Sequence, residues 1–349
     1  MSRPRIAVVG LGFMGARWGR AIAEHHGAAL AVVADLRADV GRSVADDLGA
    51  EFVADPLEAA SRPDIDGVVV CTPEDGHVDV AVTAIEAGKA VAVEKPLAHT
   101  VVDAERIRDA AEANGGLVLA GHVLRFEPRY AAIRRAIEAD EIGAVQAVRS
   151  ERIGLVADQD VLQGRTSVAL YYGVHEFDLA RWYAGEVAEV WAARSRGVVA
   201  AHGHDVEDLY SVGLSFASGA HGTAMIGWSL PPRTPGFGIA GFTVIGERGV
   251  LQVAQGTTGF QMVLDEGTVD VDVHYSPQVH GRLRGALGLE VDHFVRCVRG
   301  EQEPICTAAD GVEAVRIALA MEQAATTRTA VAVGSGADTK RDAARGVSR

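Results

Sequence analysis

The sequence predicts an α/β fold followed by an α+β fold: a doubly wound parallel sheet, then a mostly antiparallel open sheet with helices on one face. In the first third of the chain, short apolar runs alternate with amphipathic segments, which is typical of a parallel sheet covered by helices. Beyond about residue 125, apolar and polar residues alternate one by one, which indicates strands with one exposed face. At 349 residues and 48% apolar content, the chain is long enough for two domains.

Six apolar runs are the expected strands of a first domain at residues 1–121. In chain order they are RIAVVG, ALAVVAD, EFVAD, DGVVVCT, AVAVEKP and GLVLAGH. Amphipathic segments lie between them, for example at residues 75–87 and 102–113, and these are the expected helices. Strands and helices that alternate in this way predict the parallel sheet.

A second domain is expected at residues 122–333. Helical patterns cover EPRYAAIRRAIEAD, residues 174–184, 289–299 and 310–325, and hairpins are expected in DLYSVGLSFASGAHGTAMIGWSL, AGFTVIGERGVLQVAQ and GTVDVDVHY. We expect Val212, Leu214, Ala224 and Ile226 on the exposed face of this sheet, as a surface for a homodimer or homotetramer. The tail at residues 334–349 has too little apolar content to pack, so we expect it to be disordered.

Charge and cysteine content exclude several classes of protein. The chain carries 47 acidic and 33 basic side chains, a formal charge of −14, which disfavours nucleic acid and anionic membranes as partners. Cys71, Cys297 and Cys306 lack the spacing of a metal site or a disulfide framework. With no signal sequence and no apolar run of membrane-spanning length, the expected location is the cytoplasm.

A glycine-rich turn comes directly after the first expected strand. In GLGFMG, Gly10, Gly12 and Gly15 have the G-x-G-x-x-G spacing, with Phe13 and Met14 between them, at the start of a helical segment. The first glycine turns the chain, the second lets a pyrophosphate approach the backbone, and the third lets helix and strand pack. Between a strand and a helix, this pattern predicts a Rossmann dinucleotide site.

The second strand ends in Asp35, twenty residues beyond Gly15. A carboxylate at this place accepts hydrogen bonds from the adenosine ribose hydroxyls, which favours NAD over NADP. Two alternatives remain open: Asp35 caps the next helix, or Arg37 receives the 2′-phosphate of NADP.

The fifth strand ends in Glu94, Lys95 and Pro96. Ligands of open α/β sheets bind beyond the carboxyl ends of the strands, so Lys95 is expected at the site. The alternative is a solvated lysine at a strand end.

With these motifs the chain resembles the glucose-fructose oxidoreductase, inositol dehydrogenase and rhizopine-catabolism (Gfo/Idh/MocA) family, from residue 6 to about 333. The resemblance is carried by GLGFMG, CTPEDGHVDVAVTAIEAGKAVAVEKPLAHT, GHVLRFEPRY, GVHEFDLARW and TAADGVEAVRIALAMEQAA. It implies that Lys95 touches the reacting hydroxyl and the nicotinamide. It also implies that the bond between Lys95 and Pro96 is often cis. It also implies that Cys71, Thr72, Pro73 and His77 run beside the nicotinamide.

The resemblance further places His175 on the family's catalytic histidine and Asp178 on a later aspartate. Where many members have an aspartate four residues before that histidine, this chain has Tyr171, so Tyr171 or Tyr172 is expected to supply a phenol instead. The alternative for His175 is a core histidine, because VHEFDLARW is also a good amphipathic helix.

Further polar residues are candidates for the substrate cleft. His122 and Arg125 come after the last strand of the first domain, and they are either cleft residues or polar groups of the domain interface. A flexible loop before His175 offers Asp158, Gln159, Asp160, Gln163 and Arg165 to a hydroxyl-rich substrate, or else these are solvated loop residues.

These features together predict an NAD-dependent dehydrogenase that oxidises a secondary hydroxyl of a cyclic polyol, a sugar or a sugar derivative. Hydride transfer belongs to the cofactor, His175 has a suitable pKa for a base, and Lys95 moves a proton or stabilises the alkoxide. Glu94 is expected to orient Lys95 or to pack against the cofactor domain. No metal is expected. The alternatives are a redox glycosidase with tightly held NAD and a non-catalytic sugar or cofactor sensor.

Overall fold

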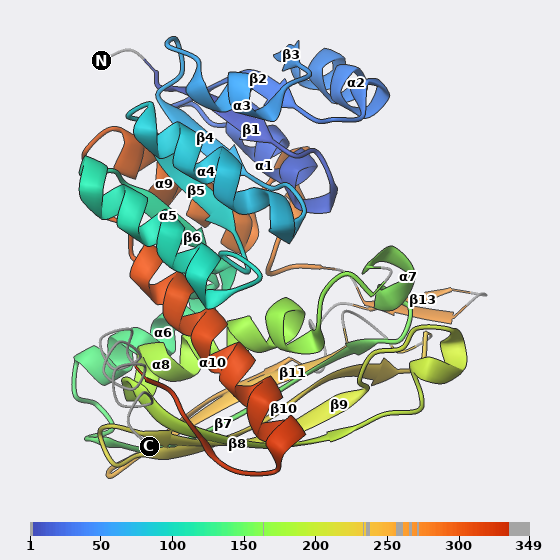
Figure 1. The fold of residues 1–349 in the computed structure, drawn as a ribbon, viewed down its shortest axis with the longest axis vertical. Helices are drawn as coiled ribbons and strands as arrows, with labels where there is room; N and C mark the ends of the chain where they lie inside the picture. The colour runs from blue at the N-terminus through green and yellow to red at the C-terminus, as the bar shows by residue number, and fades with distance from the viewer. Residues whose placement is uncertain are drawn as a thin grey trace, which may run out of the picture. The chain divides into compact units, whose positions relative to one another are not determined.

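Two β-sheets organise the chain, one in each of two structural units (Figure 1). The computed structural model describes residues 3–162, 164–232, 234, 238–255, 261–264, 267–270 and 272–334. The first unit consists of Met1–Ala132 with Thr257–Val315, and the second of Ile133–Gly256 with Arg316–Arg349. Each unit is therefore made of two stretches of chain that are far apart in sequence. Gln163 and the expected tail beyond residue 334 lie outside the described residues.

The sheet of the first unit is entirely parallel, as predicted. Its strands are β1 (Arg5–Val9), β2 (Ala29–Ala34), β3 (Glu51–Val53), β4 (Gly67–Val70), β5 (Ala90–Glu94) and β6 (Val118–Gly121). They lie in the order β3-β2-β1-β4-β5-β6. This is the Rossmann order, in which the carboxyl ends of β1 and β4 flank the point where the strand order reverses. All six strands expected from the sequence are confirmed.

Helices connect and cover these strands. They are α1 (Phe13–Ala23), α2 (Ala38–Leu48), α3 (Pro56–Ser61), α4 (His77–Glu86), α5 (Val101–Asn114) and α9 (Gly285–Val298), with the short η1 (Glu74–Gly76) and η2 (Val123–Phe126). Capping side chains fix where some of them begin: Asp55 accepts from two backbone amides of α3, and Thr100 from one of α5. Helix α9 packs against α1, where the Trp18 and Phe294 rings meet edge to face at 6.3 Å.

The sheet of the second unit has seven strands, in the order β12-β11-β7-β10-β9-β8-β17. They are β7 (Val145–Leu155), β8 (Val187–Ser195), β9 (Leu209–Phe216), β10 (His221–Leu230), β11 (Ile239–Gly246), β12 (Val250–Gln255) and β17 (Val331–Ala332). β7 and β10 pair in parallel and the other neighbours are antiparallel. The expected hairpins β9–β10 and β11–β12 are confirmed, and the sheet is mostly antiparallel, as predicted.

Further helices and two short ribbons complete the described chain. They are α6 (Pro128–Glu138), α7 (Asp158–Leu162), the π-helix η3 (Ala169–Gly173), α8 (Val174–Ala184), η4 (Ala200–His202) and α10 (Ala308–Thr327), with two ribbons, β13 (Gln261–Leu264) with β14 (Gly267–Asp270) and β15 (Gln278–Val279) with β16 (Arg282–Leu283). The flexible loop expected before His175 thus contains a short helix. η3 and α8 form one continuous helical stretch.

The sequence assigned the wrong face of the second sheet to solvent. Val212, Leu214, Ala224 and Ile226 are all buried, none more than 5% exposed. Helix α8 packs on β7 and η3 packs on β10, and the residues between the buried ones face outward, since strand residues alternate between faces. Met225, beside Ala224 and Ile226, is 41% exposed. Alternation shows that β10 has two different faces, but it does not show which face is buried, because the outer face also carries an apolar residue, Met225.

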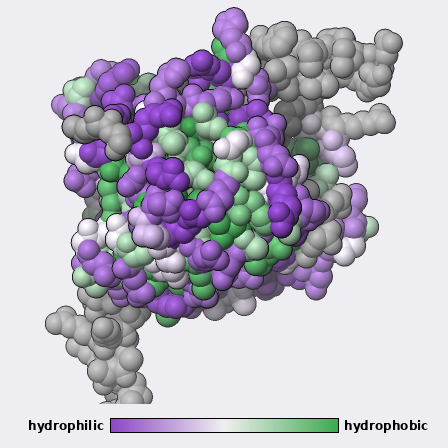
Figure 2. Space-filling view, turned by 90° about the horizontal axis from the view of Figure 1, so that it is seen from above, coloured by the Kyte–Doolittle hydropathy of each residue, from purple (hydrophilic) through white to green (hydrophobic). Residues whose placement is uncertain are grey.

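Hydrophilic residues occupy much of the face seen in Figure 2. Figure 2 shows one face on which hydrophilic residues surround a central area of hydrophobic ones. None of the helices in the described part of the chain has both the length and the hydropathy needed to cross a membrane.

Adjacent positions on β9 test which face of the second sheet is the core face. Val212→Ala removes two buried methyl groups, so the free energy of unfolding should fall by about 2 kcal/mol. Ser211→Ala, on the outer face, should change it by less than about 0.5 kcal/mol. Chemical denaturation of both variants measures the difference, and equal effects would contradict the assignment of the faces.

Candidate active site

The glycine-rich turn between β1 and α1 has the shape that a dinucleotide requires. Gly10 has φ +87°, a conformation that residues with a side chain rarely adopt. A Cβ on Gly15 would lie 1.8 Å from the carbonyl oxygen of Gly10, so only glycine allows α1 to come this close to the turn. A Cβ on Gly12, the N-cap of α1, would meet no described atom within 4 Å. The N-terminus of α1 therefore faces open space that suits a pyrophosphate.

Phe13 and Met14 begin α1 and differ in their surroundings. Phe13 is 65% exposed, and the Arg17 guanidinium lies 3.5 Å from the centre of its ring. Met14 is partly buried and packs against the core of the first unit. Arg17 adds a cation one turn into α1 that the sequence did not single out.

Asp35 is held in place at the end of β2 by four hydrogen bonds. Its carboxylate accepts from the backbone amides of Leu11 and Arg37, and from the Arg37 guanidinium at 3.1 and 3.2 Å. These bonds outweigh the desolvation caused by burial and lower the pKa of Asp35. The N-cap of α2 is Arg37, so capping α2 does not explain Asp35. Because Arg37 is engaged by Asp35, it is not poised to receive a phosphate.

The loop after β4 carries Cys71, Thr72 and Pro73, and His77 begins α4. His77 is buried, and its two ring nitrogens lie 2.9 Å from the carbonyl oxygen of Thr72 and 3.0 Å from that of Pro96. It therefore connects the loop after β4 to the loop after β5. Burial lowers the pKa of His77 and raises that of the Cys71 thiol, so both groups are neutral at neutral pH.

Glu94 and Lys95 stand side by side at the end of β5 and have different environments. Glu94 is 7% exposed; its carboxylate accepts from the Trp18 indole at 2.8 Å and from the backbone amide of Lys95 at 3.2 Å. Burial raises the pKa of Glu94, although these donors and the charge of Lys95 oppose the shift. Lys95 is partly buried rather than solvated, and its bond to Pro96 is cis, as the resemblance implied.

His122 and Arg125 come after β6 and are both buried. Arg125 donates to the carbonyl oxygen of Ile305 at 2.6 Å and lies 3.4 Å from a carboxylate oxygen of Asp310. These contacts lie within the first unit, and through them Arg125 holds the chain after β6 against residues 305–310.

In the second unit, the predicted catalytic residues lie along the η3–α8 stretch. Val174 and Phe177 are fully buried, whereas His175 between them is only partly buried. His175 is therefore not a core residue of α8. Asp178, one turn later, is buried.

The π-helix brings two tyrosines together directly before His175. The Tyr171 and Tyr172 rings meet edge to face at 4.8 Å, and both lie near the Trp228 ring. The Tyr172 hydroxyl donates to Asp158 at 2.7 Å, and burial, together with the charge of Asp158, raises its pKa. Tyr172 is thus committed to Asp158, which leaves Tyr171 as the better candidate for a substrate contact.

The structure adds residues that the sequence did not reveal. Arg152 donates to Glu176 at 2.6 Å, and burial raises the pKa of this glutamate. Gln159, expected on a loop, is fully buried, and neither of its amide atoms has a hydrogen-bond partner among the described residues. Arg165 is exposed, and the side chain of Asp160 lies outside the described part. Arg152 and Glu176 are 24 positions apart, so no local pattern pairs them.

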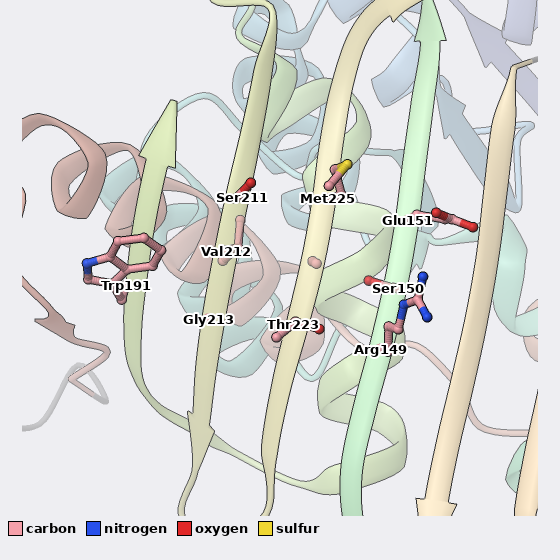
Figure 3. A pocket seen from close by; sticks show the side chains of 10 residues that line it. Arg149, Ser150, Glu151, Trp191, Ser211, Val212, Gly213, Thr223 and Met225 are labelled. Atoms are coloured by element: carbon pink, nitrogen blue, oxygen red, sulfur yellow. The ribbon is translucent and has the colours of Figure 1, made fainter. Parts of the chain in front are cut away.

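The outer face of the second sheet holds a shallow hollow of about 360 Å³. Figure 3 shows side chains from neighbouring strands around it, among them Trp191, Ser211, Thr223, Met225 and Arg149. Trp191 is 48% exposed. This outer face carries both polar and apolar side chains. The residues that the sequence analysis placed on the exposed face are buried on the opposite face of the sheet.

Known proteins resemble both parts of the chain. Residues 4–122 match the oxidoreductase family model with an NAD-binding Rossmann fold, and residues 134–333 match the C-terminal alpha/beta domain of the same family. Scyllo-inositol 2-dehydrogenase (NAD(+)) of Bacillus subtilis is 29% identical over 328 residues, which cover 90% of this chain and 92% of that protein.

Two further relatives extend the comparison. A 2,7-anhydro-N-acetylneuraminate hydratase of Mediterraneibacter gnavus is 26% identical and covers 85% of this chain and 80% of its own. The crystal structure of a myo-inositol dehydrogenase from Corynebacterium glutamicum has a TM-score of 0.79 and 26% identity over 96% of this chain and 100% of its own. With a dinucleotide turn, a strand-end lysine and both family models matched, the chain belongs to the Gfo/Idh/MocA family of oxidoreductases, and its cofactor is NAD.

Proposed function

We propose that this protein oxidises a secondary hydroxyl of a cyclic polyol, a sugar or a sugar derivative in the cytoplasm, with NAD as hydride acceptor. The observation that carries the proposal is Lys95, a partly buried cation at the carboxyl end of β5, in the same parallel sheet as the strand that bears the dinucleotide turn. Inositol dehydrogenases among the relatives support a cyclic polyol as substrate class. We place the cofactor domain at residues 1–121 and the substrate domain at 122–333.

NAD, when bound, would be the hydride acceptor. The chain itself orients the cofactor and the substrate and moves the proton. The N-terminus of α1 and Gly12 would hold the pyrophosphate, and Asp35 would hold the adenosine ribose. The neutral groups of Cys71 and His77, with Thr72 and Pro73, would line the nicotinamide end. Phe13, exposed at the start of α1, would contact the cofactor beside the turn.

The alcohol proton leaves to His175, and Lys95 stabilises the oxygen that remains. The cationic side chain of Lys95 stabilises the oxygen as its negative charge develops, and His175 accepts the proton because imidazole titrates near neutral pH. The two residues belong to different units, and the support for each comes from its own surroundings: Lys95 at a strand end, and His175 partly buried between the fully buried Val174 and the buried Glu176.

Tyr171 replaces a carboxylate with a neutral phenol in the substrate site. A phenol donates one hydrogen bond and accepts others, whereas a carboxylate only accepts. We propose that Tyr171 donates to a substrate oxygen and that Asp178, Tyr172, His122, Arg125 and Arg165 complete the polar surroundings. The preferred substrate therefore presents an acceptor, such as a ring or carboxylate oxygen, where the usual aspartate would meet a hydroxyl.

The decisive experiment monitors NADH absorbance with NAD and a panel of inositols, free aldoses, anhydrosugars, sugar acids and glycosides. Accumulation of NADH with one class supports the dehydrogenase and names its substrate. Release of an aglycone without NADH would replace it by a redox glycosidase. Tight NAD binding with neither product would replace it by a sensor.

Lysines at the two ends of β5 provide a matched test of the catalytic role. Lys95→Ala should lower kcat by at least about 100-fold, since it removes a proton-transfer or charge-stabilising group, while the Kd for NAD changes little. Lys89→Ala, at the opposite end, removes only a hydrogen bond to the carbonyl of Ile65 and should retain turnover. Near-normal turnover of Lys95→Ala would exclude Lys95 from the mechanism.

The carboxylate of Asp35 should set the cofactor preference. Asp35→Ser removes the acceptor of the ribose hydroxyls and frees Arg37 to meet a 2′-phosphate. We expect weaker NAD binding and a smaller preference for NAD over NADP, by about tenfold or more in the ratio of kcat/KM values. Asp39→Ser, in the first turn of α2, serves as the control. An unchanged ratio in Asp35→Ser would argue against this role.

We propose that the outer face of the second sheet joins subunits into a homodimer or homotetramer. Trp191 and Met225 are exposed there around a hollow, and large exposed apolar side chains on a flat sheet commonly mark an interface. Trp191→Glu places a charge in this face and should lower the molar mass measured by light scattering. Glu189→Gln, on the same strand, should leave it unchanged. An unchanged mass in both variants would place the interface elsewhere.

A further inference from the structure

A buried carboxyl group outside the proposed mechanism lies on α9. Glu290 has none of its surface exposed, and neither carboxyl oxygen receives a hydrogen bond from a donor group in the described part of the chain. An ionised carboxylate without a partner is strongly disfavoured in such a place. Glu290 is therefore neutral, and its proton needs an acceptor.

Glu94 is the neighbour that can serve as this acceptor. Helix α9 packs against β5, and the pKa of Glu290 is raised first by burial and then by the charge of Glu94. Glu94 is also buried, but it receives hydrogen bonds from the Trp18 indole and the Lys95 amide. Donors favour the ionised form of a carboxyl group. The negative charge accordingly belongs on Glu94 and the proton on Glu290.

The other groups around these two carboxyls keep the total at one negative charge. From the loop after β4, the Cys71 thiol interacts with the glutamates, and burial together with the charge of Glu94 keeps it protonated by raising its pKa. From α1, the uncharged Trp18 indole donates to Glu94. Lys95 is the cation whose charge favours ionised Glu94. One anion facing one cation is the stable arrangement, whereas a second anion would have no counter-charge among these groups.

We propose that Glu94 and Glu290 share one proton and act together as a positioning pair for Lys95. The inference rests on the proposed function, in which Lys95 meets the substrate hydroxyl. The Glu290 hydroxyl donates to the Glu94 carboxylate, whose other lone pairs accept from Trp18 and from the Lys95 amide. The bond to this amide fixes the backbone from which the Lys95 side chain projects. If Glu290 ionised, repulsion would move Glu94 and release the Lys95 amide.

The first test is the pH dependence of stability. Because the folded-state pKa of Glu290 is raised, its contribution to stability is complete below the ordinary value of 4.5 and is lost as the pH rises toward the folded-state value. Glu290→Gln keeps a neutral donor that cannot ionise. The Tm of this variant relative to wild type should therefore rise as the pH is raised above 4.5. A difference that is independent of pH would contradict a protonated Glu290.

The second test observes the proton directly by infrared spectroscopy in D₂O at neutral pH. The difference between wild type and Glu290→Gln should contain the C=O band of a protonated carboxyl group, and Glu94→Gln should shift or remove the same band. Glu301→Gln, whose side chain is 45% exposed, should change only carboxylate bands. If the Glu290→Gln difference contains no protonated-carboxyl band, the shared proton is excluded.

The third test separates positioning from packing. Glu290→Leu fills a similar volume but cannot donate, so kcat should fall by about tenfold or more, with KM for NAD changed less than about threefold. Glu290→Gln should restore kcat to within about threefold of wild type. Equal losses in both variants would contradict the positioning role. Failure of the proposed function would look different, because Lys95→Ala would then retain turnover while the infrared band stayed in place.

Discussion

The contact between Gly15 and the carbonyl of Gly10 is the constraint on which the cofactor half of the molecule depends. It places the first turn of α1 directly against the end of β1. Two consequences arise along the chain. The turn before α1 presents the Leu11 amide to Asp35, and α1 carries Trp18 onto Glu94 at the end of β5. One close backbone approach therefore aligns the carboxylate proposed to bind the ribose, the turn proposed to bind the pyrophosphate and the strand that ends at Lys95.

Each unit also places a buried carboxylate next to a proposed catalytic residue. Glu94 precedes Lys95, and Glu176 comes directly after His175. Both are almost wholly excluded from water, and each is stabilised by a donor from a distant part of the chain, Trp18 in one case and Arg152 in the other. A buried charge with a fixed partner restricts backbone movement, because leaving its partner would leave the charge unpaired. The proposed catalytic side chains thus extend from rigid neighbours.

The sequence predicted most of the fold, because apolar runs, glycine spacing and strand-end residues are local signals. All six parallel strands, the helices between them and the turn at Gly10 are predicted by such signals. The inward face of β10 was assigned to solvent, although buried Ala224 and Ile226 alternate with exposed Thr223, because the helices that cover this face come from other segments of the chain. Long-range pairs such as Trp18 with Glu94 were equally invisible, as was Glu290, because nothing in its own segment marks a buried charge.

The π-helix at residues 169–173 affects how such a site can evolve. A π-turn is a regular α-helix with one residue inserted, and the insertion rotates the residues before it by about 100° relative to the residues after it. Losing a single residue there would leave α8 and His175 undisturbed while a different side chain took the place of Tyr171. A one-codon insertion or deletion at this point would thus exchange the side chain that is proposed to meet the substrate without rebuilding the rest of the protein.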